Sequence, residues 1–450
     1  MTLALAIAHH RFGLGPRPGD LTDRDPEAWL LSQIDPAAAQ VSGGSLNSTK
    51  DALTDMQGLR NHRAALRSGN LGPEAQAALE TMLNASRNSL IQDVRTRTEH
   101  GVRTAAPFAE RWTRFWANHF TVAATRAETI GLVGPYEREA IRPHVFGRFG
   151  TLLEEAVLHP GMLFYLDNHR SFGPSTRLAK RLGRSLNENL AREVLELHTL
   201  GVDGGYTQVD VEALARALTG WLPFQPMSLR RKMTGKDVFV SQAHEPGAKT
   251  LLGKRYKRDG AGQVKAMLAD LAEHPATARH IATKIARHFL SDTPDAGDVA
   301  ALQRSFLTSG GDLAALAQTL IKRPGALETP FQKVKTPEEL MLATARALGP
   351  QAAFSKMQRV VQGFAQRPFG APSPAGWPDT ADAWMSPDAL AKRVDWASSV
   401  ARQSKAKPDD FVAAALGPLA DDSLNLAIAR AESRAQGLTL AIMSPAFQRR

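Results

Sequence analysis

The chain of 450 residues is 43% hydrophobic and 22% charged, proportions that are typical of a folded globular protein and exclude a disordered one. It contains no cysteine, which excludes disulfides, thiolate metal ligands and cysteine nucleophiles. The formal net charge of +10 would favour nucleic acid or another anionic partner only if the basic residues clustered, and they are mostly interspersed with acidic ones. We therefore do not expect a nucleic-acid-binding protein.

The N-terminal stretch MTLALAIAHHRFGLG has a short apolar run without a preceding basic residue or a cleavage-like site. This pattern is not that of a signal peptide. No segment of the sequence reaches the roughly 18 to 20 apolar residues that a membrane-spanning helix needs. On this basis we expect a cytoplasmic protein without a membrane span.

Apolar residues spaced three and four apart dominate the chain, which predicts a mainly α-helical protein. In chain order, PEAWLLSQI begins a short helix with proline in its first turn, and long amphipathic runs follow over residues 74–100 and 107–124. From residue 275 onward, several segments each begin at Pro, Asp or Thr and end at Gly or Pro, as helices joined by short turns do. We expect one bundle-like helical domain over residues 1–450.

Two segments interrupt the helical pattern, residues 223–257 and 366–385. In the first, DVFV alternates, PG supplies a turn and TLLG follows as a candidate partner strand, so we expect a small β-hairpin or an irregular excursion. In the second, the prolines and glycines of QRPFGAPSPAGWPDTADAWM exclude regular structure. Its tryptophans, Trp377 and Trp384, must still pack, so we expect an ordered loop laid across the body.

The segment NENLAREVLELHTLG, residues 187–201, predicts a regular helix with a polar face. At about 100° per residue, Glu188, Arg192, Glu193 and Glu196 share one arc. His198 lies on the apolar side, where it would be a core histidine. Exposed i, i+4 ion pairs would account for the polar face without any function. Alternatively, the carboxylates converge on a cation or a polar ligand, with Arg192 as an anion holder.

Three further residues are candidates for completing such a site. His119, on the aromatic face of the FWANHF helix, would be a general base beside an acidic helix or a hydrogen-bonded core residue. Asp167 in LDNHR would supply a hard oxygen ligand or belong to a helix-end turn. His244 in HEPG lies beside a turn, from which it would reach into a site or remain exposed. The candidate ligands of a divalent metal are Glu193, Glu196, Asp167 and His244.

Seven motifs occur in one order along nearly the whole chain, and together they resemble the bacterial family called domain of unknown function 1800. The motifs are HHRFGLGPRPGD, FWANHF, LHPGMLFYLDN, NENLAREVLELHTLGVDGGYTQVDVEALARALTGW, HEPGAKTLLG, PAGWPDTADAWMSP and MSPAFQRR. The resemblance implies a predominantly helical fold and supplies no established activity. It also implies a companion protein similar to alkaline phosphatases that carries an export signal, so export with such a partner is an alternative to a cytoplasmic location.

Two functional hypotheses follow from these observations. The first is an enzyme whose site lies on the 187–201 helix and which performs metal-assisted hydrolysis of a polar or anionic substrate. Its catalytic candidates are Glu188, Glu193, Glu196, Arg192 and His119. The second is a non-catalytic helical binding or assembly protein that works with a companion and presents the two irregular segments as a partner surface. The polar side chains would be exposed if water covers them and at least partly buried if they form a ligand site. The spacing of residues in the sequence does not show which side chains are buried.

Overall fold

Helices form nearly all the regular structure in the computed structural model, which describes residues 2–41, 46–67, 73–223, 239–257, 259–349 and 366–450. The prediction of a mainly α-helical fold is confirmed. The first helices are α1 (Leu3–Arg11), α2 (Pro26–Leu31), α3 (Thr49–Arg67), α4 (Pro73–Arg103), α5 (Pro107–His119), α6 (Ala127–Ile130), α7 (Val133–Tyr136), α8 (Phe149–Leu158) and α9 (Pro160–Tyr165). The middle of the chain contains α10 (Arg177–Leu182), α11 (Asn189–Glu193), α12 (Gln208–Leu218), α13 (Ala261–Glu273), α14 (Pro275–Phe289), α15 (Ala296–Thr308), α16 (Leu313–Ile321) and α17 (Pro337–Leu348).

The C-terminal helices are α19 (Pro387–Gln403), α20 (Pro408–Ala415), α21 (Asp422–Ala429), α22 (Arg434–Met443) and α23 (Pro445–Gln448). Two turns are π-helical, η1 (Glu137–Ile141) and η4 (Val194–His198). Short 3₁₀ turns are η2 (Arg142–His144), η3 (Asn168–Arg170), η5 (Ser241–Ala243), η6 (Ala381–Ala383) and η7 (Gly417–Leu419).

Local sequence signals set the beginnings of the helices. Proline occupies the first turn of α2, α5, α14 and α17, where its missing N–H costs no helical hydrogen bond. At α17, the Thr336 side chain accepts the N–H of Glu339, and the Glu339 carboxylate accepts the N–H of Thr336. This reciprocal capping fixes the position of Glu339, which also lines a cavity described below.

Two large hydrophobic cores hold most of the described helices together, and two small clusters accompany them. The larger core surrounds α5, whose side chains of Phe108, Trp112, Phe115 and Trp116 are buried on one face of the helix. The second core is built from α1, α17 and the C-terminal helices. Because α1 contributes apolar side chains to both cores, it joins the two halves of the molecule.

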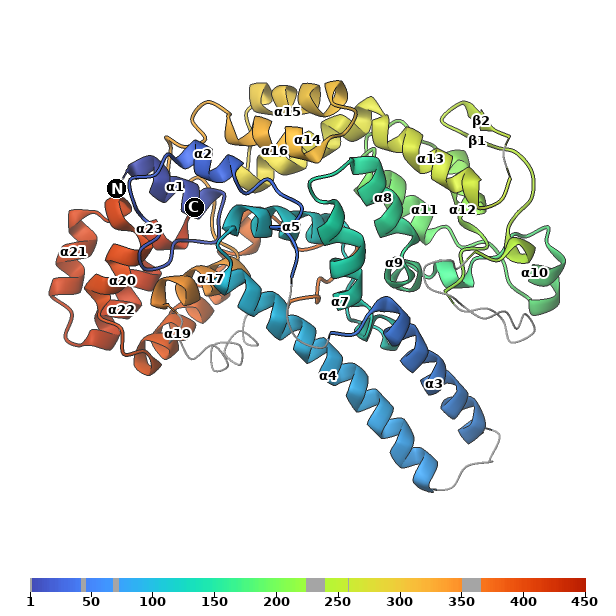
Figure 1. Cartoon of the computed structure of the whole chain (residues 1–450), viewed down its shortest axis with the longest axis horizontal. Helices are drawn as coiled ribbons and strands as arrows, with labels where there is room; N and C mark the ends of the chain where they lie inside the picture. The colour runs from blue at the N-terminus through green and yellow to red at the C-terminus, as the bar shows by residue number, and fades with distance from the viewer. Residues whose placement is uncertain (1, 42–45, 68–72, 224–238, 258, 350–365) are drawn as a thin grey trace.

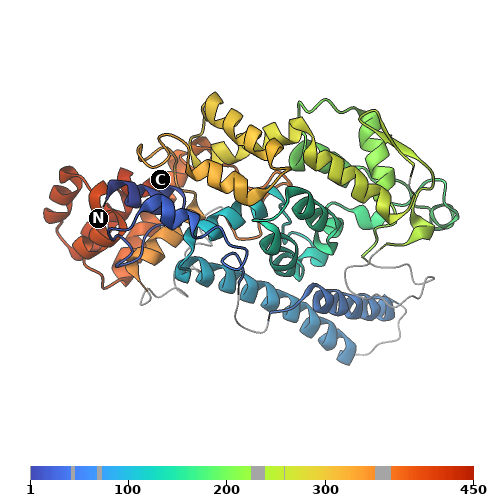
Figure 2. The ribbon, with the colours of Figure 1, turned by 45° about the horizontal axis from the view of Figure 1, so that its top comes forward.

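The molecule is elongated, with the C-terminal helices at one end and the hairpin with α10 to α13 at the other (Figure 1). Helices α3 and α4 pack side by side and project from the body as a long arm (Figures 1 and 2). The chain ends lie near each other, and the backbone of Arg450 pairs with that of Lys333. None of the described helices is long and apolar enough to cross a membrane.

A small β-hairpin is present in the predicted region, but its strands differ from those predicted. Strand β1 (Lys249–Leu251) pairs antiparallel with β2 (Lys254–Tyr256), so TLLG supplies the first strand and the turn. The turn residues Leu252 and Gly253 both have positive φ, as a tight two-residue hairpin turn requires. In the segment DVFV, which was expected to form the first strand, Phe239 forms an isolated antiparallel β-bridge with Trp221. Residues 224–238 lie outside the described residues.

The segment 366–385 crosses the body as an irregular strap, the name used for it below. Asn118, near the end of α5, holds it through two hydrogen bonds: its Nδ2 donates to the Trp377 carbonyl (2.9 Å), and its Oδ1 accepts the Trp377 N–H (2.8 Å). Gly376 has φ +83°, and a Cβ there would lie 2.5 Å from the Asn118 carbonyl oxygen, so this close approach requires glycine. Trp384 is buried, and its indole N–H donates to the Pro378 carbonyl (3.0 Å).

Candidate functional site

The polar segment at residues 187–201 is not the regular α-helix that its spacing predicts. Helix α11 covers Asn189–Glu193 only, and the chain continues in the π-helical turn η4. The Thr199 hydroxyl donates to the Val194 carbonyl (2.6 Å) where this turn ends. Single π-helical turns occur frequently at functional sites, because they redirect side chains at the cost of regular hydrogen bonding.

The outward face of this segment holds the predicted acidic residues in two different settings. Glu188 lies 3.2 Å from Arg192, and the Gln208 side chain bonds to both, which is a partly exposed surface arrangement. Glu193 and Glu196 are half-buried. Burial raises the pKa of Glu193, and the neighbouring charge of Glu196 adds to the rise. The two carboxylates therefore lie close enough to repel each other.

Asp167 and His244, the other predicted metal ligands, are engaged elsewhere. Asp167 Oδ1 lies 2.7 Å from an Arg126 guanidinium nitrogen. His244 Nδ1 lies 2.9 Å from the Thr219 carbonyl oxygen, and its Nε2 lies 3.1 Å from Asp259 Oδ1. Within the described part of the chain, no three His, Asp or Glu side chains are arranged to hold a metal ion. The predicted ligand set is not brought together here, and it stays a prediction.

The inward side of the segment faces a set of buried histidines. His119 Nε2 donates to the His198 carbonyl, and His280 Nε2 donates to the Leu197 carbonyl, each at 3.1 Å. These bonds satisfy carbonyls at the end of the π-helical turn. His198 is fully buried, and neither of its ring nitrogens has a hydrogen-bond partner among the described residues. Burial, together with the charge of Lys284, lowers the pKa of His198 to about 3, so its ring is neutral.

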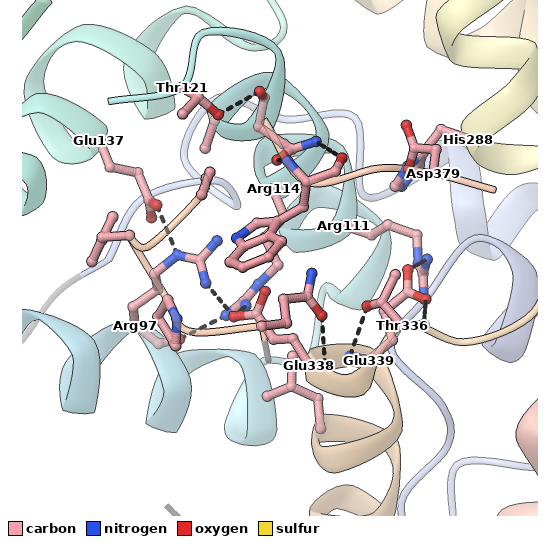
Figure 3. A pocket seen from close by; sticks show the side chains of 18 of the residues that line it. Arg97, Arg111, Arg114, Thr121, Glu137, His288, Thr336, Glu338, Glu339 and Asp379 are labelled. Carbon is pink, nitrogen blue, oxygen red and sulfur yellow. Dashed lines mark hydrogen bonds and ion pairs between the residues drawn. The ribbon is translucent and has the colours of Figure 1, made fainter. Parts of the chain in front are cut away.

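A separate cavity of about 100 Å³ lies between α4, α5, α17 and the strap (Figure 3). Its charged lining residues are Arg97, Arg111, Arg114, Glu137, Glu338, Glu339, His288 and Asp379, and its aromatic ones are Tyr136, Phe369 and Trp377. None of its described lining residues belongs to the 187–201 segment. A cavity of this size holds several water molecules or a ligand of a few non-hydrogen atoms.

Ion pairs neutralise one wall of this cavity. The network consists of three arginines and three glutamates, which are Arg97, Arg114, Arg142, Glu110, Glu137 and Glu338. Arg142 is fully buried and donates to both Glu110 (2.7 and 3.2 Å) and Glu137 (2.6 and 2.9 Å). Although burial acts to raise the pKa of Glu137, the charges of Arg97 and Arg142 lower it to about 2. With equal numbers of opposite charges, the network adds no net charge to the cavity.

His288 and Asp379 form a hydrogen-bonded pair on another side of the cavity (Figure 3). His288 Nδ1 lies 2.7 Å from Asp379 Oδ1. Burial opposes ionisation of Asp379, but the interactions with His288 and Lys333 lower its pKa, and burial lowers the pKa of His288. A neutral imidazole beside a carboxylate donates its Nδ1–H, which leaves a lone pair on Nε2. This Nε2 is buried and has no hydrogen-bond partner among the described residues.

The sequence analysis did not identify His288, Asp379 or the arginines as site residues. One signal was present: His280, Lys284 and His288 recur every fourth residue and therefore share one face of α14. No spacing rule could pair His288 with Asp379, because they lie 91 residues apart on a helix and an irregular segment.

Fold and cavity together define a helical protein with a cavity lined by charged, aromatic and apolar side chains, among them a hydrogen-bonded histidine–aspartate pair. The chain belongs to the family described as protein of unknown function (DUF1800), whose model matches residues 7–449. The resemblance inferred from the seven motifs is thereby confirmed. Comparison with curated proteins and with solved structures gave no match.

Proposed function

We propose that the protein is an enzyme that hydrolyses a small polar or anionic substrate in the cavity, with His288 as the general base. The observation that carries the proposal is the His288–Asp379 pair at the lining of the cavity, in which the Nε2 of His288 has no hydrogen-bond partner among the described residues. Such a nitrogen accepts a proton from a water molecule as that water attacks the substrate. The adjacent carboxylate holds the correct tautomer and stabilises the imidazolium that forms.

The arginines of the cavity support this chemistry. Arg111 uses its Nε for the Gly13 carbonyl and its Nη1 for Glu339, and Arg97 uses its Nε and Nη1 for two glutamates. The Nη2 groups of Arg97 and Arg111 make no hydrogen bond to a described residue, whereas that of Arg114 donates to the Arg97 carbonyl (2.9 Å). A fixed guanidinium N–H at a cavity wall stabilises negative charge that develops in a hydrolytic transition state. The substrate therefore needs a polar group or a single negative charge within reach of these groups.

A hydrolysis screen with small chromogenic esters, amides and phosphomonoesters tests the proposal. We expect wild-type turnover of at least one of these compounds. His288→Gln removes the base and Asp379→Asn its orienting partner, so each should lower kcat by about 10²- to 10⁴-fold. Glu212→Gln, in an exposed ion pair on α12, is the matched control and should leave turnover unchanged.

Equal turnover by wild type and His288→Gln would refute the role of this residue. The tautomer of the His288 ring provides a second test, which needs no substrate. In long-range ¹H–¹⁵N spectra at pH 7, His288 should carry a proton on Nδ1 and none on Nε2. A proton on Nε2 would mean that the ring cannot act as the base.

A second hypothesis places a cation between Glu193 and Glu196, and the mutual repulsion of these carboxylates favours it. Elemental analysis of purified protein, with melting curves recorded with and without chelator, tests this. Near-stoichiometric metal that is lost in both Glu193→Gln and Glu196→Gln would support metal-assisted chemistry at the 187–201 segment. Metal content that is independent of both residues would remove this hypothesis.

A third hypothesis is a non-catalytic assembly role with the alkaline-phosphatase-like companion, and the projecting α3–α4 arm favours it (Figure 1). Ile91 on α4 is a large apolar side chain of this arm that is 64% exposed. Ile91→Glu should weaken a complex with the companion while leaving the monomer folded. A complex of unchanged affinity would argue against the arm as the contact.

A further inference from the structure

Two groups of buried ion pairs border the cavity, and they differ in the balance of their charges. In the network of three arginines and three glutamates described above, every arginine contacts two glutamates and every glutamate contacts two arginines. The second group consists of Arg111, Arg450 and Glu339. Its two arginines share one carboxylate, and neither forms an ion pair with another side chain in the described part of the chain. This second group therefore keeps one positive charge without a counter-charge.

The single carboxylate of this group has no oxygen left for a further cation. Glu339 Oε1 accepts a hydrogen bond from Arg111 Nη1, and its Oε2 accepts the Thr336 N–H (2.9 Å) and the Arg450 Nε–H (3.2 Å). Arg450 also donates to the His288 carbonyl (2.8 Å), so the group lies directly beside the histidine of the cavity. Both arginines are only 2% exposed, and a buried charge without full compensation is costly.

Arg111 is the arginine of this group that can meet a ligand, because it lines the cavity and Arg450 is not among the described lining residues. Its Nε donates to the Gly13 carbonyl (2.5 Å) and its Nη1 to Glu339, which leaves Nη2 without a hydrogen bond to a described residue. Burial lowers the pKa of Arg111 to about 10, so the guanidinium is still charged at neutral pH. A charged, buried N–H group at a cavity wall is a binding point for an anionic oxygen.

The rest of the cavity wall restricts the ligand further. Apolar side chains also line it, among them Leu14, Val122 and Leu342, and all three are buried. Leu14 follows Gly13, whose carbonyl accepts the Arg111 Nε–H, so one loop supplies both an apolar wall and a support for the guanidinium. The volume of about 100 Å³ admits a ligand of only a few non-hydrogen atoms. A ligand with one negative charge and a short hydrocarbon part matches these features.

We propose that the cavity binds a short aliphatic carboxylate, with one carboxylate oxygen accepting a hydrogen bond from Arg111 Nη2 and the hydrocarbon part lying against the apolar side chains. The single negative charge of the ligand balances the excess positive charge of the group formed by Arg111, Arg450 and Glu339. A cation fits less well, because the guanidinium repels it and Glu339 has no free oxygen. The assignment of the carboxylate to the substrate rests on the proposed hydrolysis, whereas the binding itself does not.

Ligand-observed NMR titrations of the full chain at pH 7 with butyrate and with butyramide, its neutral analogue of similar size, test the proposal. We expect the wild type to bind butyrate at least about 10-fold more tightly than butyramide, because charge-assisted hydrogen bonds are roughly twice as strong as neutral ones. Arg111→Met should abolish this preference. The variant should fold, because Glu339 keeps Arg450 as its partner and the group becomes neutral. Arg216→Met, in an exposed ion pair on α12, is the matched control and should keep the preference.

A competition experiment on the wild type covers the case in which Arg111→Met does not fold: acetate should displace butyrate, and acetamide should not. Equal affinities for butyrate and butyramide, a preference that survives in folded Arg111→Met, or tighter binding of inorganic phosphate than of butyrate would each overturn the proposal. Butyrate binding without turnover of any ester would support this inference and count against the proposed hydrolysis. Turnover that depends on His288, without a preference for butyrate, would have the opposite meaning.

Discussion

Glu110 offers the most direct test of the buried ion-pair network beside the cavity. It is fully buried on α5, and its carboxylate bonds to Arg142 (2.7 and 3.2 Å) and to Arg114 (2.7 Å). Burial alone would raise its pKa, but the two guanidinium charges hold that pKa far below its ordinary value, so the group is ionised. Glu110→Gln removes one negative charge and keeps the shape of the side chain.

The expected loss follows from the charges that remain. In the wild type three arginines face three glutamates, whereas the variant has three positive charges against two negative ones. Removal of one partner from a buried ion pair costs about 3 to 5 kcal/mol, because the other charge stays buried without compensation. Since glutamine retains one hydrogen-bond acceptor, we expect a loss of about 3 kcal/mol in the free energy of unfolding.

Urea unfolding, followed by circular dichroism and tryptophan fluorescence, measures this loss as a change in midpoint at constant slope. The exposed pair of Glu212 and Arg216 supplies the control, and Glu212→Gln should cost less than about 1 kcal/mol. The double variant Glu110→Gln/Arg142→Met removes both charges, so its loss should be smaller than the sum of the two single losses. A loss below about 1 kcal/mol for Glu110→Gln at unchanged slope would refute the reasoning.

Three further predictions concern other parts of the molecule. The pKa of Glu137 is about 2 in the folded protein and about 4.3 in an unfolded chain. The ionised carboxylate therefore stabilises the folded state fully above the unfolded pKa, and this contribution is lost as the pH falls toward 2. Glu137→Gln should reduce this acid dependence of the urea midpoint. Asn118→Ala removes two hydrogen bonds of about 1 kcal/mol each, so backbone hydrogen exchange at Trp377 should rise roughly 10- to 30-fold, and unchanged exchange would contradict this anchoring. Glu193→Gln should raise the urea midpoint at pH 7, because the raised pKa of Glu193 means that ionisation of this carboxyl disfavours the folded state. The gain should vanish near pH 4, where the carboxyl is protonated in both states. Destabilisation at pH 7 would instead indicate a bound cation.

Features that depend on near neighbours in the chain were predictable from the sequence. The alternation of helix-starting and helix-ending residues after residue 275 corresponds to α14 through α17. Thr207 and Asp210 have the spacing of a capping box and form one at the beginning of α12, and α12 packs against the neighbouring helix α11. In each case the interacting groups lie within one or two helical turns or one loop, so their spacing determines the contact.

Features that depend on burial or on distant segments were not predictable in the same way. The turn of the hairpin consists of Leu252 and Gly253, both with positive φ. Leucine is not a typical residue for such a turn, so the sequence does not indicate the turn position. The π-helical turn η4 inserts one residue per turn relative to an α-helix, so a wheel of 100° per residue misplaces side chains beyond Val194. The strap was expected to be ordered because of its tryptophans, but its contact with Asn118 joins residues 259 positions apart.

The end of α5 links the two candidate regions, and this arrangement separates the functional hypotheses. Asn118 holds the strap that carries Asp379, whereas the next residue, His119, bonds to the His198 carbonyl at the end of the polar segment. Variants at this end of α5 should therefore disturb both regions, whichever one binds the ligand. Glu193 belongs to the polar segment, and His288 lines the cavity. If His288→Gln abolishes turnover while Glu193→Gln preserves it, the cavity is the catalytic site, and the converse pattern assigns that role to the polar segment.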